Sequence, residues 1–534
     1  MKIRIKNSFI KLNIVSVAVC SLLLLASCTG DFSDINKDPN AATEEELGYD
    51  NLGVGSLITQ MQHQIYPCVT KDQNIDVNNY QKMFSLAGDV YSGHQGASNM
   101  FNNNGRNNTT YDMTPDWYST AYTIGYQNYM TPWHTLLKKK SISPEAFAVG
   151  QILKVFGMHR ITDMYGPIPY KNFVPISNVP FNSQEDVYDT FFNELDEAVE
   201  ILQEYIKNNP GARSLVDYDK IYSSDFNKWI LFANSLKLRL ALRLVYVDGS
   251  KAQAKAEKAI AAGVFTTNED NAMISVTGTS TVNPLAKICY EYNDTRLGAT
   301  MESYLKGYKD PRLEKLFDES EVSNRKEYNG IRNGSNFKGN EYKVFSTLKV
   351  THSTPIQVMT AAEVFFLRAE VALRGWNAGG PSAKELYEQG INTAFDHTGA
   401  GNAAAYIEGT TLPEPYVDPM NSKYDYSKTG QAPVKWEEDK GLEQIITQKW
   451  IALYPDGQEA WSEFRRTGYP LVIPVGENFS GSIDTRKQIA RLPYPNNLKI
   501  DYPLLYPEAL SLLGGADTGA TKLWWDRNTY KPYQ

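Results

Sequence analysis

Two polar segments of the sequence combine aromatic rings with amide and guanidinium groups. Residues 92–112 are rich in Asn and Gly, and residues 288–296 carry two tyrosines beside polar side chains. A ring offers an apolar face, while amides and guanidinium groups form hydrogen bonds, and this combination suits the apolar face and hydroxyl rim of a sugar. We predict ligand contacts at His94, Phe101, Arg106, Tyr111, Tyr290, Tyr292, Asn293 and Arg296. For each of them, ordinary loop packing is the alternative.

The motifs of several enzyme classes are absent from the sequence. No His is followed by Glu, which excludes an HExxH zinc motif, and no Gly-Lys dipeptide of a phosphate-binding loop occurs. There is no GxSxG elbow, and the six His residues are scattered without ligand-like spacing. The sequence therefore predicts a protein that is not an enzyme and needs neither cofactor nor metal. A glycoside hydrolase remains an alternative, because its two carboxylates can come from distant loops without any motif.

The charge balance argues against a nucleic-acid partner. The 534 residues include 53 Lys+Arg against 61 Asp+Glu, a net charge of −8, with no long basic run. Binding to phosphates requires a basic surface. A chain of this length with 42% hydrophobic residues can bury a large core without a structural metal or a disulfide framework.

The N-terminus has the pattern of a bacterial lipoprotein signal. Four basic residues within the first eleven positions precede an apolar run from Ile14 to Ala26, which is too short to span a bilayer. Small residues then stand directly before Cys28. We predict a signal peptide over residues 1–27, lipidation of Cys28, and a polar tether through residue 50. A plain secretory signal or an N-terminal membrane anchor is the alternative. Cleavage removes four positive charges and no negative ones, which moves the net charge from −8 to −12.

The remaining cysteines, Cys68 and Cys289, form no CxxC motif and have no zinc-like spacing. They could pair in an extracytoplasmic protein, but nothing in the sequence places them together. We favour two free thiols.

The tether contains part of the spacing of a calcium loop, in Asp34, Asn36 and Asp38 with Glu45 at position twelve. Pro39 occupies the position at which such a loop needs Gly. We therefore predict no calcium site in this segment.

Helix signals dominate the mature chain. Ser143-Pro144-Glu145 predicts a helix start, and Gly166-Pro167 predicts its end. Ser183 opens a second helix, and Ser224-Asp225 opens a third. The third is apolar on two faces, through residues such as Leu236 and Leu238, so we expect it to lie between neighbouring helices.

An internal repeat with an offset of 131 residues supports a stack of helix pairs. Residues 241–243 recur as residues 372–374, and Glu257 recurs as Glu388. Helix pairs with small residues at close-packing positions are the unit of tetratricopeptide-type stacks. We predict a mainly α fold in a single domain over 51–534. Its helical scaffold would cover about 115–265, 356–397 and 441–470, and loop-rich irregular parts would cover about 266–355, 398–440 and 471–534.

A stripe of aromatic residues follows helical spacing at the start of this scaffold, at Tyr118, Tyr122, Tyr126, Tyr129 and Trp133. Such a stripe is more often a packed helix face than a ligand platform. We predict packing for it.

Several segments spread over nearly the whole mature chain form a recognisable set. They are Cys28 with Phe32–Asn40, Arg160–Tyr170, Phe232–Arg243, Ala362–Glu370, Gln448–Tyr454, Gly457–Trp461, Arg465–Pro470 and Trp524–Asp526. Together, and in this order, they resemble the SusD/RagB family of outer-membrane nutrient-binding lipoproteins.

This resemblance implies a SusD-like fold and a lipid-anchored protein of the outer membrane that faces the cell exterior. It also implies a function: capture of an oligosaccharide or polysaccharide and its delivery to a TonB-dependent, SusC-like transporter. The matching motifs belong to the scaffold, so residues such as Glu459, Trp461, Arg465 and Arg466 are expected to be structural or to face the partner. A peptide-binding member of the same family, a lipid-anchored glycoside hydrolase and a scaffold that binds only proteins are the alternatives.

Overall fold

The structure, a computed structural model, describes residues 51–67, 74–101, 105–175, 178–276, 281–322 and 324–533. The chain divides into residues 1–53 and a unit from Val54 to Gln534. The signal peptide, Cys28, the tether with its calcium-like spacing, and Cys68 lie outside the described residues. The second unit is described below.

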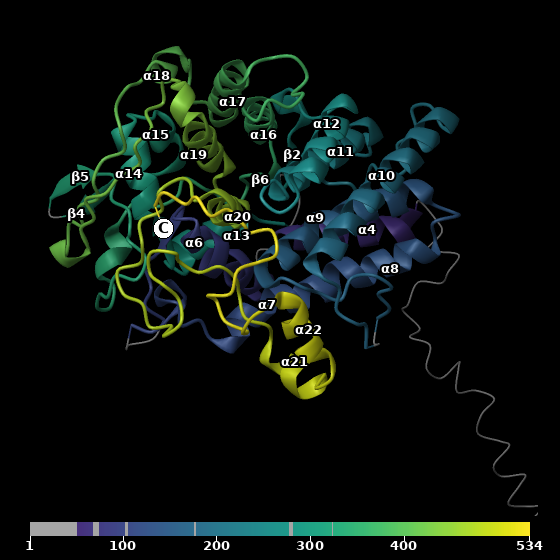
Figure 1. The fold of residues 1–534 in the computed structure, drawn as a ribbon, viewed down its shortest axis with the longest axis horizontal. Helices are drawn as coiled ribbons and strands as arrows, with labels where there is room; N and C mark the ends of the chain where they lie inside the picture. Colours follow the sequence, from purple (N-terminus) through teal and green to yellow (C-terminus); the bar gives the residue numbers. More distant parts are fainter. Residues whose placement is uncertain are drawn as a thin grey trace, which may run out of the picture. The chain divides into compact units, whose positions relative to one another are not determined.

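Four pairs of helices form the scaffold of this unit (Figure 1), and the members of each pair contact one another. This confirms the mainly α prediction and places both copies of the 131-residue repeat on helix pairs. The pairs are α9 (Pro144–Tyr165) with α10 (Gln184–Asn208), α11 (Phe226–Arg243) with α12 (Gly249–Ala261), α16 (Ala361–Leu373) with α17 (Ala383–Thr398), and α19 (Gly441–Leu453) with α20 (Gly457–Thr467).

The predicted helix starts are confirmed, although the Ser143 side chain makes no capping hydrogen bond to α9. Pro144 is the first residue of α9, and Gly166 follows its last residue with φ of 92°. The Ser183 hydroxyl accepts a hydrogen bond from the backbone N–H of Asp186 at 3.1 Å and caps α10. Asp225 caps α11 in the same way. The third helix, α11, ends at Arg243, and turns follow it.

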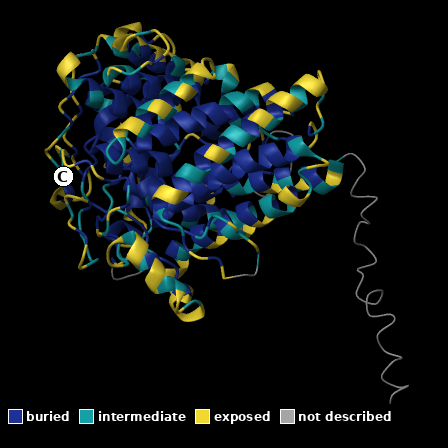
Figure 2. Cartoon of the chain, turned by 45° about the vertical axis from the view of Figure 1, so that its right-hand side comes forward, coloured by how far each residue is buried: buried dark blue, intermediate teal, exposed yellow. Residues whose placement is uncertain are grey.

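Helices α9 and α11 lie in the interior, and for α11 the two-sided apolar pattern predicted this. Every residue of α9 from Glu145 to Tyr165 is buried, and α11 is buried continuously from Phe232 to Arg243. Figure 2 shows this as dark blue along the central helices, with exposed residues at helix ends and outer faces. A polar residue on such a helix must find a partner inside the protein.

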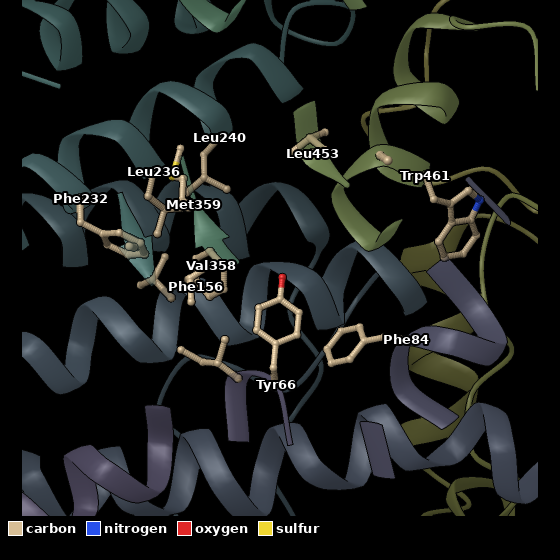
Figure 3. Close-up of a cluster of buried hydrophobic side chains, with 14 of the residues drawn as sticks. Tyr66, Phe84, Phe156, Phe232, Leu236, Leu240, Val358, Met359, Leu453 and Trp461 are labelled. Carbon is tan, nitrogen blue, oxygen red and sulfur yellow. The ribbon is translucent and has the colours of Figure 1, made fainter. Parts of the chain in front are cut away.

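The hydrophobic core joins the helix pairs to the N-terminal helices (Figure 3). Tyr66 follows α4 (Leu52–Ile65), and its ring lies 5.2 Å, centroid to centroid, from Phe84. Phe156 of α9 meets Phe232 of α11 with ring centroids 5.6 Å apart. The core is therefore continuous from the beginning of the described unit to its second half.

The other described helices lie outside these four pairs. Before α9 lie α5 (Asn74–Tyr80), the π-helix η2 (Gln81–Gly88), α6 (Asp89–Tyr91), η3 (Asn108–Thr110), α7 (Pro115–Gly125), the π-helix η4 (Tyr126–Met130) and α8 (Thr131–Lys138). Later come η5 (Asn268–Asp270), α13 (Pro284–Ala286), the π-helix η6 (Lys287–Glu291), α14 (Ala299–Gly307), α15 (Arg312–Leu316), η7 (Glu341–Val344), α18 (Ala404–Ile407), η8 (Ser422–Tyr424), η9 (Glu438–Lys440), α21 (Asn496–Asp501) and α22 (Leu505–Leu513).

The strands of the described part form three short antiparallel pairs. These are β1 (Gln95–Ala97) with β3 (Thr295–Leu297), β2 (Ala272–Ile274) with β6 (Ile356–Met359), and β4 (Ser320–Val322) with β5 (Arg325–Glu327). The first two pairs connect segments that are far apart in the sequence, so they hold loops in place on the helical scaffold.

The aromatic stripe of α7, η4 and α8 packs inward, as predicted. Tyr118, Tyr122 and Tyr129 are buried in the core, and Tyr126 and Trp133 are partly buried against it. The Tyr129 hydroxyl donates a hydrogen bond to the carbonyl of Gln64 at 2.6 Å. Among the described helices, none has both the length and the apolar character needed to cross a membrane.

Candidate functional site

The two polar segments singled out in the sequence lie side by side in the structure. Strand β1 from the first segment pairs with β3 from the second, with Gln95 opposite Leu297 and Ala97 opposite Thr295. Beyond the strands, the Ser98 hydroxyl donates to the carbonyl of Asn293 at 2.8 Å. Residues almost 200 positions apart therefore contribute to one surface, which we call the β1–β3 edge: residues 98–101, 105, 106 and 290–296.

Asp294 anchors this edge through hydrogen bonds to two other segments. Its two carboxylate oxygens accept hydrogen bonds from the Asn99 amide at 2.8 Å and from the Gln81 amide at 2.7 Å. Burial raises the pKa of Asp294, although these amide hydrogen bonds oppose the effect. Asp294 positions the edge and is not itself accessible, a role that no local sequence pattern signals.

Phe101 is half-buried at one end of the edge. Its backbone is held in the left-handed region with φ of 55°, and its N–H donates to the Asn99 side chain at 2.9 Å. Its ring contacts Trp117 nearly at right angles, with centroids 5.0 Å apart. A non-glycine residue in this backbone conformation requires support from its surroundings, so the Phe101 ring is presented in a fixed position.

Tyr290 is the most accessible ring of the edge, with 45% of its surface exposed. Its hydroxyl donates to the carbonyl of Leu348 at 2.5 Å, which holds the ring in place. The ring borders a surface hollow of about 320 Å³, whose other lining residues include Glu291 and His352. Nε2 of His352 lies 3.3 Å from Oε1 of Glu291. A fixed ring beside a hollow lined by hydrogen-bonding groups can stack on one sugar and bind the hydroxyls of the next.

Asn293 and Tyr292 complete the turn beside Tyr290, and both are half-buried. Asn293 has φ of 56°, a conformation that Asn tolerates better than most residues. Its amide nitrogen donates to the carbonyl of Tyr290 at 3.2 Å. Tyr292 packs partly against the core.

Arg296 was predicted as a ligand contact, but the structure buries it, with 2% of its surface exposed. Its guanidinium donates to the carbonyls of Cys289 and Lys343 at 3.1 and 2.7 Å, and to the Asn293 side chain at 3.1 Å. In this conformation it shapes the turn and cannot reach a ligand directly.

His94 is also buried in this structure, with no exposed surface. Its Nε2 lies 2.8 Å from the carbonyl of Trp450, and its ring packs against Trp450 with centroids 4.9 Å apart. Burial lowers the pKa of His94 to about 3, so the ring is neutral and Nε2–H donates to that carbonyl. His94 therefore connects β1 to the scaffold rather than to a ligand.

Tyr111 and Arg106 differ in accessibility. Tyr111 is 7% exposed and packs against Tyr91, so it too is out of reach. Arg106 is exposed, and its Nε donates to Asp112 at 2.7 Å while its guanidinium lies 5.3 Å from the centroid of the Phe479 ring. Of the eight predicted contacts, five remain accessible: Phe101, Arg106, Tyr290, Tyr292 and Asn293.

The accessible groups of the edge can contact a ligand by stacking and by hydrogen bonds. Within the described ranges, no group of three His, Cys, Asp or Glu side chains could hold a metal ion. Cys289, the free thiol of this region, is buried, and burial raises its pKa, which suppresses the nucleophilic thiolate. The accessible groups are rings, amides, the Arg106 guanidinium and the neighbouring side chains of Glu291 and His352.

A family comparison identifies the fold. The model of the SusD-like family, described as SusD and RagB outer membrane lipoproteins, matches residues 34–526. The chain belongs to the SusD-like family. No match was found among curated proteins.

Solved SusD homologues share this structure along nearly their whole length. A chitin-binding SusD homologue from Flavobacterium johnsoniae is 38% identical, with a TM-score of 0.84, and the match covers 90% of this chain and 100% of that one. SusD homologues from Bacteroides vulgatus and Bacteroides ovatus are 34% and 33% identical, both with TM-scores of 0.82. Those matches cover 90% and 89% of this chain, and 98% and 99% of theirs. By family, the SusD-like chain is an outer-membrane lipoprotein, and the sequence predicts a lipoprotein signal directly before Cys28.

Proposed function

We propose that this SusD-like lipoprotein binds a glycan at the β1–β3 edge on the cell surface and delivers it to a SusC-like, TonB-dependent transporter. The observation that carries the proposal is Tyr290. Its ring is 45% exposed, tethered through its hydroxyl, and placed beside a hollow with hydrogen-bonding walls. A ring that is already immobilised loses little entropy on stacking against a sugar.

The similarity to a chitin-binding relative supports a saccharide ligand and suggests chito-oligosaccharides as the first probe. Neutral sugars suit the edge, because the charged groups there are paired with one another, Arg106 with Asp112 and Glu291 with Lys287. Catalysis is not part of the proposal. Delivery to a transporter rests on the family resemblance, and lipid at Cys28 would hold the protein at the membrane.

Calorimetric titration with oligosaccharides and oligopeptides tests the ligand class. We expect saturable binding of at least one oligosaccharide, without release of shorter products. Binding of oligopeptides with no binding of any saccharide would favour the peptide-binding alternative. Hydrolysis of a bound glycan would favour the hydrolase. Co-purification of a barrel-forming protein with the lipidated chain tests the partner.

A further inference from the structure

Helices α21 and α22 form an apolar projection, residues 496–513, from the body of the described unit (Figure 1). Leu504, directly before α22, is 86% exposed, and Ile500 of α21 is 79% exposed. Within α22, which the structure describes in full, Ala509 is buried while Leu512 is exposed. Figure 2 shows exposed residues along this projection. Much of its apolar surface is therefore open to solvent.

An apolar groove of about 450 Å³ lies beside the projection. Leu498, Tyr502 and Leu505 of the projection line it together with η4 and the loop that follows α9. Tyr126 of η4 and Phe173 of that loop contribute rings whose centroids are 5.8 Å apart. We call the projection and the groove together the α21–α22 surface. A contiguous exposed apolar surface of this kind marks a site of contact with a protein or a membrane.

Two exposed carboxylates belong to this surface. Asp501 and Glu508 are exposed, and no described cation forms an ion pair with either. Lys499, the one basic residue of the projection, lies 3.9 Å from Asp517, which also binds Arg491 at 2.8 Å. The unpaired charges that the projection offers to a partner are therefore negative.

These carboxylates argue against a lipid surface and against a second copy of the chain. Helices that lie in a bilayer interface carry Lys and Arg on their polar face and are attracted to anionic lipids, whereas α22 carries Glu508 and no basic residue. A symmetric contact between two copies joins identical surfaces, so it would place these carboxylates in one interface, where like charges repel. An apolar protein segment with Lys or Arg beside it fits both features of the surface.

The scaffold motifs do not supply a surface for a protein partner. Glu459, Trp461, Arg465 and Arg466 are each at most 3% exposed. A contact with a partner therefore has to use residues outside these motifs, and the α21–α22 surface combines strongly exposed apolar side chains with a groove beside them.

We propose that the α21–α22 surface is the docking site for the SusC-like transporter. An apolar segment of the transporter occupies the groove and packs on Ile500 and Leu504, while Lys or Arg residues beside that segment pair with Asp501 and Glu508. The identity of the partner rests on the proposed function. The location of the contact rests on the exposure, the groove and the charge of this surface.

Affinity purification of the lipidated, full-length mature chain from detergent-extracted membranes tests this surface. We expect the wild type to retain a TonB-dependent barrel, identified by mass spectrometry. Leu504→Glu should retain at least tenfold less, because a charge replaces an apolar anchor, and Ile500→Glu should reproduce the loss. Ile142→Glu is the matched control and should retain the barrel as the wild type does. Ile142 is 82% exposed and precedes the first turn of α9, whereas the groove lies beyond the last turn of that helix, at Pro169.

Glu508→Lys tests the charge of the partner. It should lower retention of the barrel severalfold, because it brings a cation toward the Lys or Arg of the transporter. Two results would assign the surface to another occupant and overturn the proposal. One is binding of the lipid-free Cys28→Ser chain to vesicles of phosphatidylglycerol and phosphatidylethanolamine that Leu504→Glu abolishes. The other is a dimer in sedimentation that Leu504→Glu converts to a monomer.

Failure of this inference differs from failure of the proposed function. Equal retention of the barrel by Leu504→Glu and the wild type would overturn docking at this surface and leave delivery to a transporter intact. Absence of the barrel from the wild-type preparation would overturn delivery itself, and this docking site with it. Leu504→Glu should keep the melting temperature and the oligosaccharide affinity of the wild type, because the side chain that it replaces is exposed.

Discussion

Arg243 of α11 and Glu459 of α20 are joined inside the scaffold, although they are 216 residues apart in the sequence. Nη2 of Arg243 lies 2.7 and 2.6 Å from the two carboxylate oxygens of Glu459. The side chains are 1% and 3% exposed. Arg243 also binds Glu463, and Lys449 lies 3.8 Å from Glu459. Two helix pairs are thus connected by a buried charge network and not only by apolar contacts.

Removing one member of this network should be costly, because the opposite charge would remain buried without its partner. We predict that Glu459→Gln, which keeps the shape of the side chain, lowers the free energy of unfolding by about 3 kcal/mol. Denaturant titration measures the effect. Glu408→Ala removes the partner of Lys435 in an exposed pair and is the control, with no measurable change expected. Equal effects of the two substitutions would refute a structural role for the network.

Glu463 makes the network sensitive to acid. Burial alone would raise the pKa of Glu463, but Arg466, Lys449 and Arg243 outweigh it and hold the pKa well below the usual value. A lowered pKa contributes stability above the unfolded-state value of about 4.3, and this contribution is lost as the pH falls further. The difference in unfolding free energy between the wild type and Glu463→Gln should therefore be largest above about pH 5 and narrow toward pH 3. A pH-independent difference would contradict the account.

For the buried carboxyl of Asp89, we predict that the free energy of unfolding depends on pH in the opposite direction. It is 1% exposed, and burial, with the nearby charge of Asp456, raises its pKa to about 8. Between the unfolded pKa and this value, the folded state holds one proton more than the unfolded state. Stability is then complete at low pH and falls as the pH rises toward 8, by up to about 1.4 kcal/mol per pH unit. Asp89→Asn has no such proton, so its stability relative to the wild type should rise from pH 5 to pH 8. If the unfolding free energies of Asp89→Asn and the wild type changed in parallel between pH 5 and pH 8, a raised pKa of Asp89 would be ruled out.

Lipidation at Cys28 is a separate prediction from the sequence. Cys28→Ser removes the thiol that would carry the lipid, so the variant should take up no labelled palmitate and should leave the membrane fraction. Metabolic labelling with cell fractionation measures both effects. Labelling of the variant equal to that of the wild type would show that the anchor lies elsewhere.

The sequence predicted the helical scaffold well because the sequence signals for where a helix starts, ends and packs are local. Caps such as Ser183, stops such as Gly166, and apolar periodicity depend on neighbouring residues, and the structure confirms them. The candidate site depends on pairing between distant segments. His94 stands in a polar, Asn- and Gly-rich segment that reads as an exposed loop, but Trp450, 356 residues away, buries it. The role of Asp294 likewise depends on Gln81, 213 residues earlier.

The affinity of Tyr290→Ala for an oligosaccharide that binds the wild type tests the central claim most directly. We predict a loss of about tenfold, equivalent to about 1.4 kcal/mol for a lost stacking ring, with an unchanged melting temperature. Tyr530→Ala, which removes a more exposed ring elsewhere, should bind as the wild type does. Equal affinities of the Tyr290→Ala and wild-type proteins would contradict a glycan site at the β1–β3 edge.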